Sequence, residues 1–187
     1  MNSFFKTKNS YGSTYIDSFP LAVSHQKRIS SHKTFNGLAA RGKTSVGWFY
    51  GFKVHLIING WGEILDFVII PGNVVDNNEN VIKKITSKVH GKIYGDKGYL
   101  LNTDLFKKLY SKVIHMVTKI KKNMKNKLMS ITDKFMLKKR GLIESVGAVL
   151  KEDLNIEHSR YRSPISLIVN ILSALTAYGL RKKTFNL

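Results

Sequence analysis

Aromatic and β-branched residues concentrate in short runs over the first two thirds of the chain, and such runs are typical of β-strands. The turn Gly60-Trp61-Gly62 separates two of these runs and predicts a β-hairpin. Because Pro20 has no N–H to donate to a sheet, we expect it at a sheet edge or at the end of its strand. The predicted strands are Thr14 to Val23, Trp48 to Asn59, Glu63 to Ile70, Lys92 to Tyr94 and Val113 to Ile120.

Apolar residues with a helical period predict four helices. These are Asp76 to Lys88, with Asp76 or Asn77 as its N-cap, Asn102 or Thr103 to Tyr110, Thr132 or Asp133 to Leu154, and Pro164 to Leu180. Residues 25–43 show no sustained apolar period and predict a basic loop. The order of these elements predicts an α/β fold, with a mixed five-stranded sheet and flanking helices. We divide the chain into a ragged N-terminal remnant, residues 1–13, and one domain, residues 14–187.

The chain is very basic: among 187 residues, 31 are Lys or Arg and 12 are Asp or Glu, a formal charge of +19. This charge predicts a polyanionic partner, first of all nucleic acid, although a ribosomal setting or a membrane surface can select for the same excess. The longest weakly polar run, Ile165 to Leu180, contains polar residues and falls short of the about 20 apolar residues of a membrane span. We therefore expect no membrane segment. The absence of cysteine fits a reducing compartment such as the cytoplasm.

Three acidic residues stand in apolar surroundings: Asp17, Asp96 and Glu144. A buried carboxylate needs a cation, an amide or a metal ion as a partner. One acid on a first strand, one after a neighbouring strand and one on a later helix is an arrangement that can hold two Mg²⁺ ions for phosphoryl transfer. Arg140 and Lys151 flank Glu144 on the predicted helix. Taken alone, Arg140 and Glu144 also fit an ordinary surface ion pair of residues i and i+4.

Five short motifs in order resemble one family. They are Tyr15-Ile16-Asp17-Ser18, Trp48-Phe49-Tyr50-Gly51-Phe52-Lys53 with His55, Pro71-Gly72-Asn73, Gly95-Asp96-Lys97-Gly98-Tyr99, and Arg140-x₃-Glu144-x₆-Lys151. Together, from about Thr14 to Tyr178, they resemble the catalytic domain of bacterial insertion-sequence transposases of the DDE class. The resemblance implies an RNase H-like fold and a DNA transposase that uses Mg²⁺, with Mn²⁺ as a substitute. It also implies cleavage of transposon-end DNA by water and strand transfer by the freed 3′-hydroxyl.

The resemblance also implies roles for single residues. Asp17, Asp96 and Glu144 match the acids that bind the two metal ions, and Arg140 and Lys151 match the basic members of the signature Y-x₂-R-x₃-E-x₆-K. Leu137 stands where that signature has its tyrosine. Full transposases of this type carry a DNA-end-binding region upstream, so we expect this chain to be N-terminally truncated. The implied partner is double-stranded DNA, both transposon ends and target, bound by a homodimer when full-length, in the bacterial cytoplasm at the nucleoid.

A set of basic residues is predicted to contact DNA phosphates, each contact adding to the salt dependence of binding. They are Lys97, Lys119, Lys121, Lys122, Lys125, Lys127, Lys138, Lys139, Arg160 and Arg162. A solvated basic face is the simpler interpretation of the same residues. For Trp48 we expect core packing rather than stacking on bases. Two alternatives to a working transposase remain: a non-catalytic basic nucleic-acid-binding module, in which the acids only balance Lys and Arg, and an inactive transposase fragment.

Overall fold

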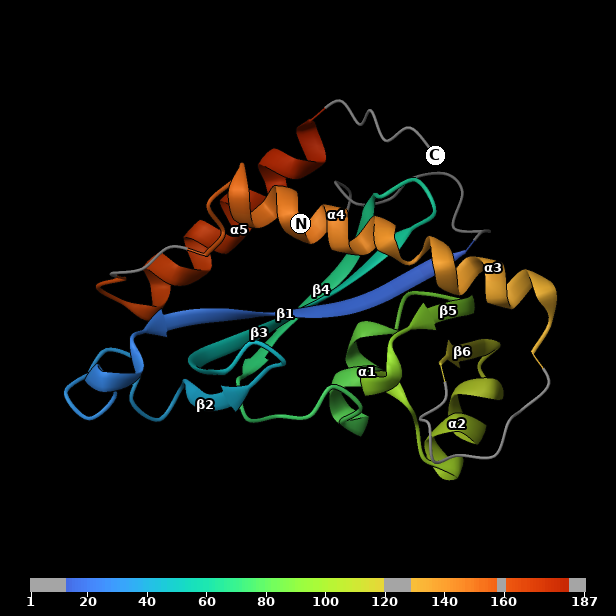
Figure 1. Cartoon of the computed structure of the whole chain (residues 1–187), viewed down its shortest axis with the longest axis horizontal. Helices are drawn as coiled ribbons and strands as arrows, with labels where there is room; N and C mark the ends of the chain where they lie inside the picture. Colours follow the sequence, from blue (N-terminus) through green and yellow to red (C-terminus); the bar gives the residue numbers. More distant parts are fainter. Residues whose placement is uncertain (1–12, 120–128, 158–160, 182–187) are drawn as a thin grey trace.

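A computed structural model describes residues 13–119, 129–157 and 161–181 of the chain. Its centre is a six-stranded mixed sheet with the order β2-β3-β1-β5-β6, in which β4 also pairs with β3 (Figure 1). The strands are β1 (Thr14–Ser24), β2 (Ala40–Lys43), β3 (Trp48–Asn59), β4 (Ile64–Pro71), β5 (Gly91–Gly95) and β6 (Ile114–Thr118). Strand β3 is antiparallel to β1, β2 and β4, whereas β1, β5 and β6 are parallel. The predicted α/β fold and its five strands are confirmed.

Strand β2 is the one strand of the described structure that the sequence did not predict. It lies in the segment expected to be a basic loop, after a 3-10 turn, η1 (Gln26–Arg28). Its pairing with β3 depends on Gly42, because a Cβ there would lie 2.3 Å from the carbonyl oxygen of Gly72 and 2.6 Å from the ring of Phe49. The neighbours Arg41 and Lys43 are exposed, so no apolar alternation marks this strand.

Pro20 lies within β1, opposite Lys53 of β3. On its other side β1 pairs with β5 only at Thr14 and Tyr15, so no strand there requires an N–H from Pro20. The expectation that Pro20 sits at a sheet edge is therefore confirmed.

The helices are α1 (Glu79–Ile85), α2 (Thr103–Tyr110), α3 (Ile131–Lys139), α4 (Gly141–Glu152) and α5 (Pro164–Leu180), with a 3-10 turn, η2 (Lys97–Tyr99), after β5. Two predictions were wrong. The N-cap of α1 is Asn78, whose side chain accepts from the N–H groups of Asn80 and Val81, and not Asp76 or Asn77. The long helix expected up to Leu154 is two helices, because the regular ladder breaks at Arg140, before Gly141, a residue that is unfavourable inside a helix.

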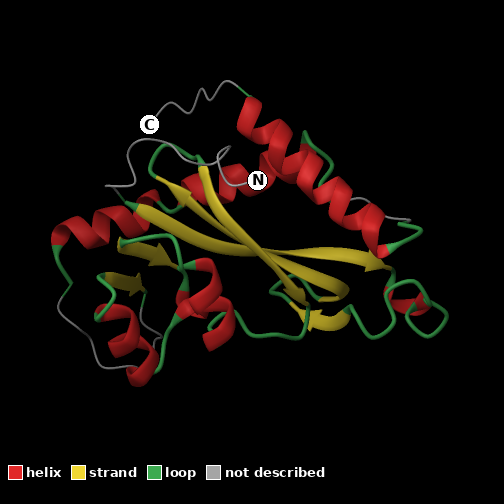
Figure 2. Cartoon of the chain, turned by 180° about the vertical axis from the view of Figure 1, so that it is seen from behind, coloured by secondary structure: helices red, strands yellow, loops and turns green. Residues whose placement is uncertain are grey.

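Alternation along the central strands divides the core between the two faces of the sheet. Tyr15 and Leu56 face one side, where they pack against α4 and α5. Ile16 and Ile57 face the other side, where they pack against α1 and α2. Figures 1 and 2 show these two layers of helices on opposite sides of the sheet. Within the described ranges, no helix is both long and apolar enough to span a bilayer.

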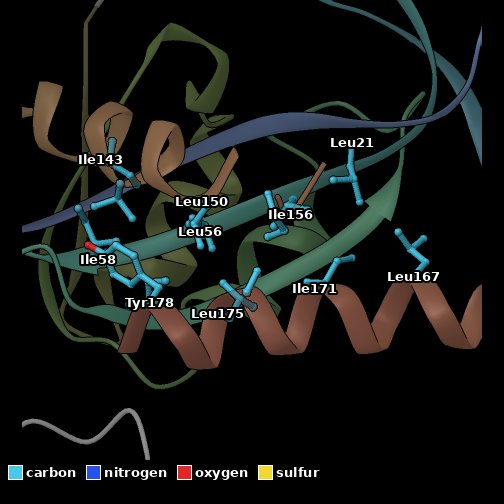
Figure 3. Packing of buried hydrophobic residues seen from close by; sticks show 14 of the residues in the cluster. Leu21, Leu56, Ile58, Ile143, Leu150, Ile156, Leu167, Ile171, Leu175 and Tyr178 are labelled. Carbon is cyan, nitrogen blue, oxygen red and sulfur yellow. The ribbon is translucent and has the colours of Figure 1, made fainter. Parts of the chain in front are cut away.

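Helix α5 packs against the sheet and α4 through one stripe of buried residues. Leu167, Ile171, Leu175 and Tyr178 point from it toward the sheet and α4 (Figure 3). Tyr178 also donates its hydroxyl to the carbonyl oxygen of Gly62 at 2.7 Å, which ties the helix to the β3–β4 turn.

The buried stripe of α5 predicts that Ile171 and Ile168 contribute very differently to stability. Ile171 is fully buried, so Ile171→Ala should lower the free energy of unfolding by about 2 to 5 kcal/mol through lost packing and a cavity. Ile168 is 49% exposed on the same helix, and Ile168→Ala should change it by less than about 0.5 kcal/mol. Urea unfolding of the two variants measures the difference. Equal losses would contradict the described packing of α5.

Candidate active site

Asp17, within β1, and Asp96, just after β5, come close together through the parallel pairing of these two strands. The last registered pair is Tyr15 with Tyr94, and each acid lies two residues beyond it. Gly95 allows the end of β5 to lie against β1, because a Cβ there would be 2.9 Å from Cγ2 of Ile16. Asp96 then begins the turn η2. The two strand-borne acids are therefore neighbours in space, although they are far apart in the chain.

Arg140 joins Glu144 to the first of these acids. Its Nη1 lies 2.9 Å from Oδ2 of Asp17, and its Nη2 lies 2.7 Å from Oε1 of Glu144. Arg140 can reach both because it stands at the junction of α3 and α4, with Glu144 in the first turn of α4. The pair of residues i and i+4 is thus present, but its guanidinium is also bound to the sheet. The side chain of Arg140 is only 15% exposed.

The charges of the other two acids, Glu144 and Asp96, act on Asp17. Burial is the main cause that raises the pKa of Asp17 from 3.8 to about 6. The N–H of Ser18, which donates to Oδ1 at 2.8 Å, and the guanidinium of Arg140 act in the opposite direction. The negative charges of Glu144 and Asp96 raise the pKa further. Asp17 is therefore close enough to Glu144 and to Asp96 to feel their charges, and a cation placed beside it would be stabilised.

The donor chemistry of this site fits a divalent metal ion. Asp17, Asp96 and Glu144 supply the hard carboxylate oxygens that Mg²⁺ prefers. As the side chains stand, no three His, Asp or Glu residues of the described ranges are gathered closely enough to hold a metal ion. The guanidinium of Arg140 bridges two of the three acids, and it supplies the positive charge between them.

Five of the other residues predicted for the site belong to segments that carry or adjoin the acids. Lys151 lies with its Nζ 5.3 Å from the ring centre of Phe19, two residues after Asp17, and it also pairs with Glu157 at 3.4 Å. Lys97 follows Asp96 directly and is exposed, as are Lys119, Lys138 and Lys139. Lys119 follows Thr118, the register partner of Gly95, so it emerges beside the Asp96 turn.

Arg162 is exposed next to Tyr161, whose ring centre lies 6.4 Å from that of Phe35. Phe35 packs on Phe52 opposite the C-terminal half of β1, so the structure does not bring Arg162 to the acids. Lys121, Lys122, Lys125, Lys127 and Arg160 lie outside the described residues.

The structure shows the surroundings of Leu137 and Trp48. Leu137, the departure from the tyrosine of the signature, is 4% exposed and packs in the core with α4. The expectation that Trp48 packs in the core was wrong, because its side chain is 48% exposed. The ring of Trp48 is instead flanked by the guanidinium carbon of Arg41 at 4.7 Å and Nζ of Lys43 at 5.4 Å.

A polar cluster that the sequence did not predict lies on the opposite face of the sheet. We call it the Asp76 cluster: Ser18, Lys53, His55, Asp76 and Tyr99. Oδ1 of Asp76 accepts from Oγ of Ser18 at 3.2 Å and from Nζ of Lys53 at 3.0 Å. Tyr99 and Nδ1 of His55 share a hydrogen bond of 2.8 Å, and burial lowers the pKa of His55 to about 4. In the sequence, Lys53 and His55 indicate this cluster, because they are two polar residues on the same face of the largely apolar strand β3.

The mixed sheet with parallel strands β1, β5 and β6, one acid within β1, a second just after β5 and a third on a following helix defines an RNase H-like α/β fold with a candidate acid triad. Residues 7–164 match the family model described as the transposase DDE domain, and the chain belongs to this family. The matched range includes all three acids, Arg140 and Lys151. No curated protein matches the chain.

The raised pKa predicts how stability depends on pH in the absence of metal ions. The stability contributed by protonated Asp17 is complete below pH 3.8 and is lost as the pH rises through about 6, because the folded protein disfavours the charge. Asn cannot ionise, so Asp17→Asn should gain about 2 kcal/mol relative to wild type between pH 4 and pH 7.5, at 1.36 kcal/mol per pKa unit. Urea unfolding in EDTA at the two pH values measures this gain. A difference between the proteins that does not change with pH would contradict it.

Proposed function

We propose that this domain cleaves transposon-end DNA with water and joins the freed 3′-hydroxyl to target DNA, with Mg²⁺ as cofactor and Mn²⁺ as a substitute. Membership in the transposase DDE domain family supports this proposal. The observation that carries it is the convergence of Asp17, Asp96 and Glu144, whose charges interact although they come from β1, the end of β5 and α4.

In this proposal Asp17, Asp96 and Glu144 hold two metal ions. When bound, such a pair of ions activates the attacking oxygen and stabilises the leaving oxygen of an in-line displacement, with no covalent protein intermediate. The residues of the chain supply the rest. Arg140 holds Glu144 toward Asp17 and places a guanidinium, the group best suited to phosphate oxygens, at the same point.

The proposed partner is double-stranded DNA, both transposon ends and target. Four exposed lysines support this partner: Lys97 and Lys119 follow the ends of β5 and β6, and Lys138 and Lys139 precede Arg140. All four belong to segments that also carry or adjoin the acids. We place Lys151 in the same site, because it covers Phe19 beside Asp17. Assembly as a homodimer on DNA, in a bacterial cytoplasm at the nucleoid, belongs to the same proposal.

The first test is metal-dependent nicking of supercoiled plasmid DNA. Wild type should nick in Mg²⁺ or Mn²⁺ and not in EDTA, and Asp96→Asn should lower the rate by about 100-fold or more, because it removes a metal-binding carboxylate. Asp104→Asn, an equal change at the exposed first turn of α2, is the control and should nick like wild type. Equal nicking by the Asp96 variant and wild type would reject the role of Asp96. Tight DNA binding without nicking by wild type would favour a non-catalytic binding module.

The second test concerns the lysines beside the site. If Lys138 and Lys139 each neutralise a phosphate, the double variant Lys138→Ala, Lys139→Ala should reduce the slope of log K against log salt by about 2. Lys83→Ala with Lys84→Ala, an adjacent pair on α1, is the matched control and should leave the slope unchanged. Fluorescence anisotropy with a labelled duplex at several salt concentrations measures both. Identical slopes for wild type and the Lys138 and Lys139 variant would show that these lysines form a solvated face.

A further inference from the structure

The Asp76 cluster lies behind the acid site, on the other face of the sheet. Ser18, next to Asp17 in β1, faces this side together with His55 and Lys53 of β3, because Ser18 is the register partner of His55 and alternation repeats every two residues. Asp17 faces the side covered by α4. A residue of this cluster therefore does not share the Asp17 face, and it acts on the acids through the backbone that carries them.

Asp76 is bound to the segment of the first acid. Its Oδ1 accepts from Oγ of Ser18 at 3.2 Å, and the N–H of the same Ser18 donates to Oδ1 of Asp17 at 2.8 Å. Lys53 fixes Asp76 in turn, because its Nζ donates to Oδ1 of Asp76 and to the carbonyl oxygen of Val74, both at 3.0 Å. A continuous chain of polar contacts thus runs from Lys53 through Asp76 and Ser18 to Asp17.

Asp76 also lies against the segment that carries Asp96. A Cβ on Gly98 would stand only 3.1 Å from Oδ2 of Asp76, so the turn η2 that begins at Asp96 packs directly on this carboxylate. The adjacent Asn77 donates its side-chain amide to the carbonyl oxygen of Leu100 at 2.9 Å, at the other end of the turn. Asp76 therefore touches both acid-bearing segments, 17–18 and 96–99.

His55 and Tyr99 complete the contacts of this cluster with the Asp96 segment. His55 has no exposed surface, and its Nδ1 holds the hydroxyl of Tyr99, the last residue of η2, at 2.8 Å. Its Nε2 has no hydrogen-bond partner and lies 3.8 Å from Oδ1 of Asp76. A buried nitrogen without a partner is costly, so this arrangement is held by the packing and contacts around it.

We propose that Asp76, fixed by Lys53, is a positioning residue that sets the spacing of the Asp17 and Asp96 carboxylates from behind the sheet. The proposal rests on the proposed function of these two acids as metal-binding residues. Groups that orient metal-binding residues through hydrogen bonds affect metal affinity strongly, although they do not touch the ion. A purely structural ion pair between Lys53 and Asp76 would instead affect only stability.

The test compares Mn²⁺ binding by the full chain without DNA, measured by isothermal titration calorimetry. Asp76→Asn should raise the dissociation constant about tenfold, and Asp17→Asn should abolish binding. Asp66→Asn is the matched control, because Asp66 is also partly buried, accepts a backbone N–H and pairs with a lysine, Lys88 at 3.5 Å, but belongs to β4. It should bind Mn²⁺ like wild type. Thermal unfolding of each variant separates lost affinity from lost fold.

Ser18→Ala is a gentler variant that removes only the hydroxyl between Asp76 and the Asp17 segment. It should weaken Mn²⁺ binding as well, and Asp76→Asn should add little in the Ser18→Ala background, because both changes break the same link. In plasmid nicking, Asp76→Asn should need more Mg²⁺ for half-maximal rate and recover much of its rate at high Mg²⁺, whereas Asp96→Asn should not recover.

The outcomes separate the two proposals. Normal Mn²⁺ affinity in folded Asp76→Asn and Ser18→Ala, with binding lost in Asp17→Asn, would overturn the positioning role and leave the metal site standing. Absence of Mn²⁺ binding by wild type would contradict the proposed function, and the positioning role with it. A tenfold loss in Asp76→Asn that matches Asp66→Asn would also overturn the role, because it would then be a general effect of removing a buried carboxylate.

Discussion

The bridge from Arg140 to Asp17 and Glu144 is the interaction on which the site depends. Burial raises the pKa of Asp17, and the negative charges of Glu144 and Asp96 raise it further. A single guanidinium at the junction of α3 and α4 offsets part of this increase and attaches helix α4 to strand β1. This contact lies where α3 ends and α4 begins.

The sheet places Asp17 and the Asp76 cluster on opposite faces. On one face Asp17 meets Arg140 and the first turn of α4. On the other face Lys53 and Asp76 belong to a closely bonded polar cluster above the apolar residues that pack against α1. Strand β1 connects the two, because neighbouring residues point to opposite faces. Asp17 therefore faces α4, and the adjacent Ser18 faces the Asp76 cluster.

Much of the fold and of the triad was predictable because each depends on local patterns. The strand alternation around Asp17, the strand that ends before Asp96 and the family motifs placed these acids correctly in the secondary structure. Strand β2 was not predictable, since its pairing relies on the close approach of Gly42 to Gly72 rather than on apolar residues. The role of Asp76 was hidden for a similar reason. Its partners, Ser18 and Lys53, come from other strands, and a polar residue just before a helix is usually a cap.

The central claim is that Asp17, Asp96 and Glu144 form one site for divalent metal ions. Crystals grown with Mn²⁺ and measured at its absorption edge test this most directly, because anomalous scattering locates the metal without assumptions about activity. The account predicts Mn²⁺ among these three carboxylates, with the Arg140 guanidinium moved away from at least one of them. Mn²⁺ bound only elsewhere, or an unchanged bridge from Arg140 to Asp17 and Glu144 at saturating Mn²⁺, would contradict it.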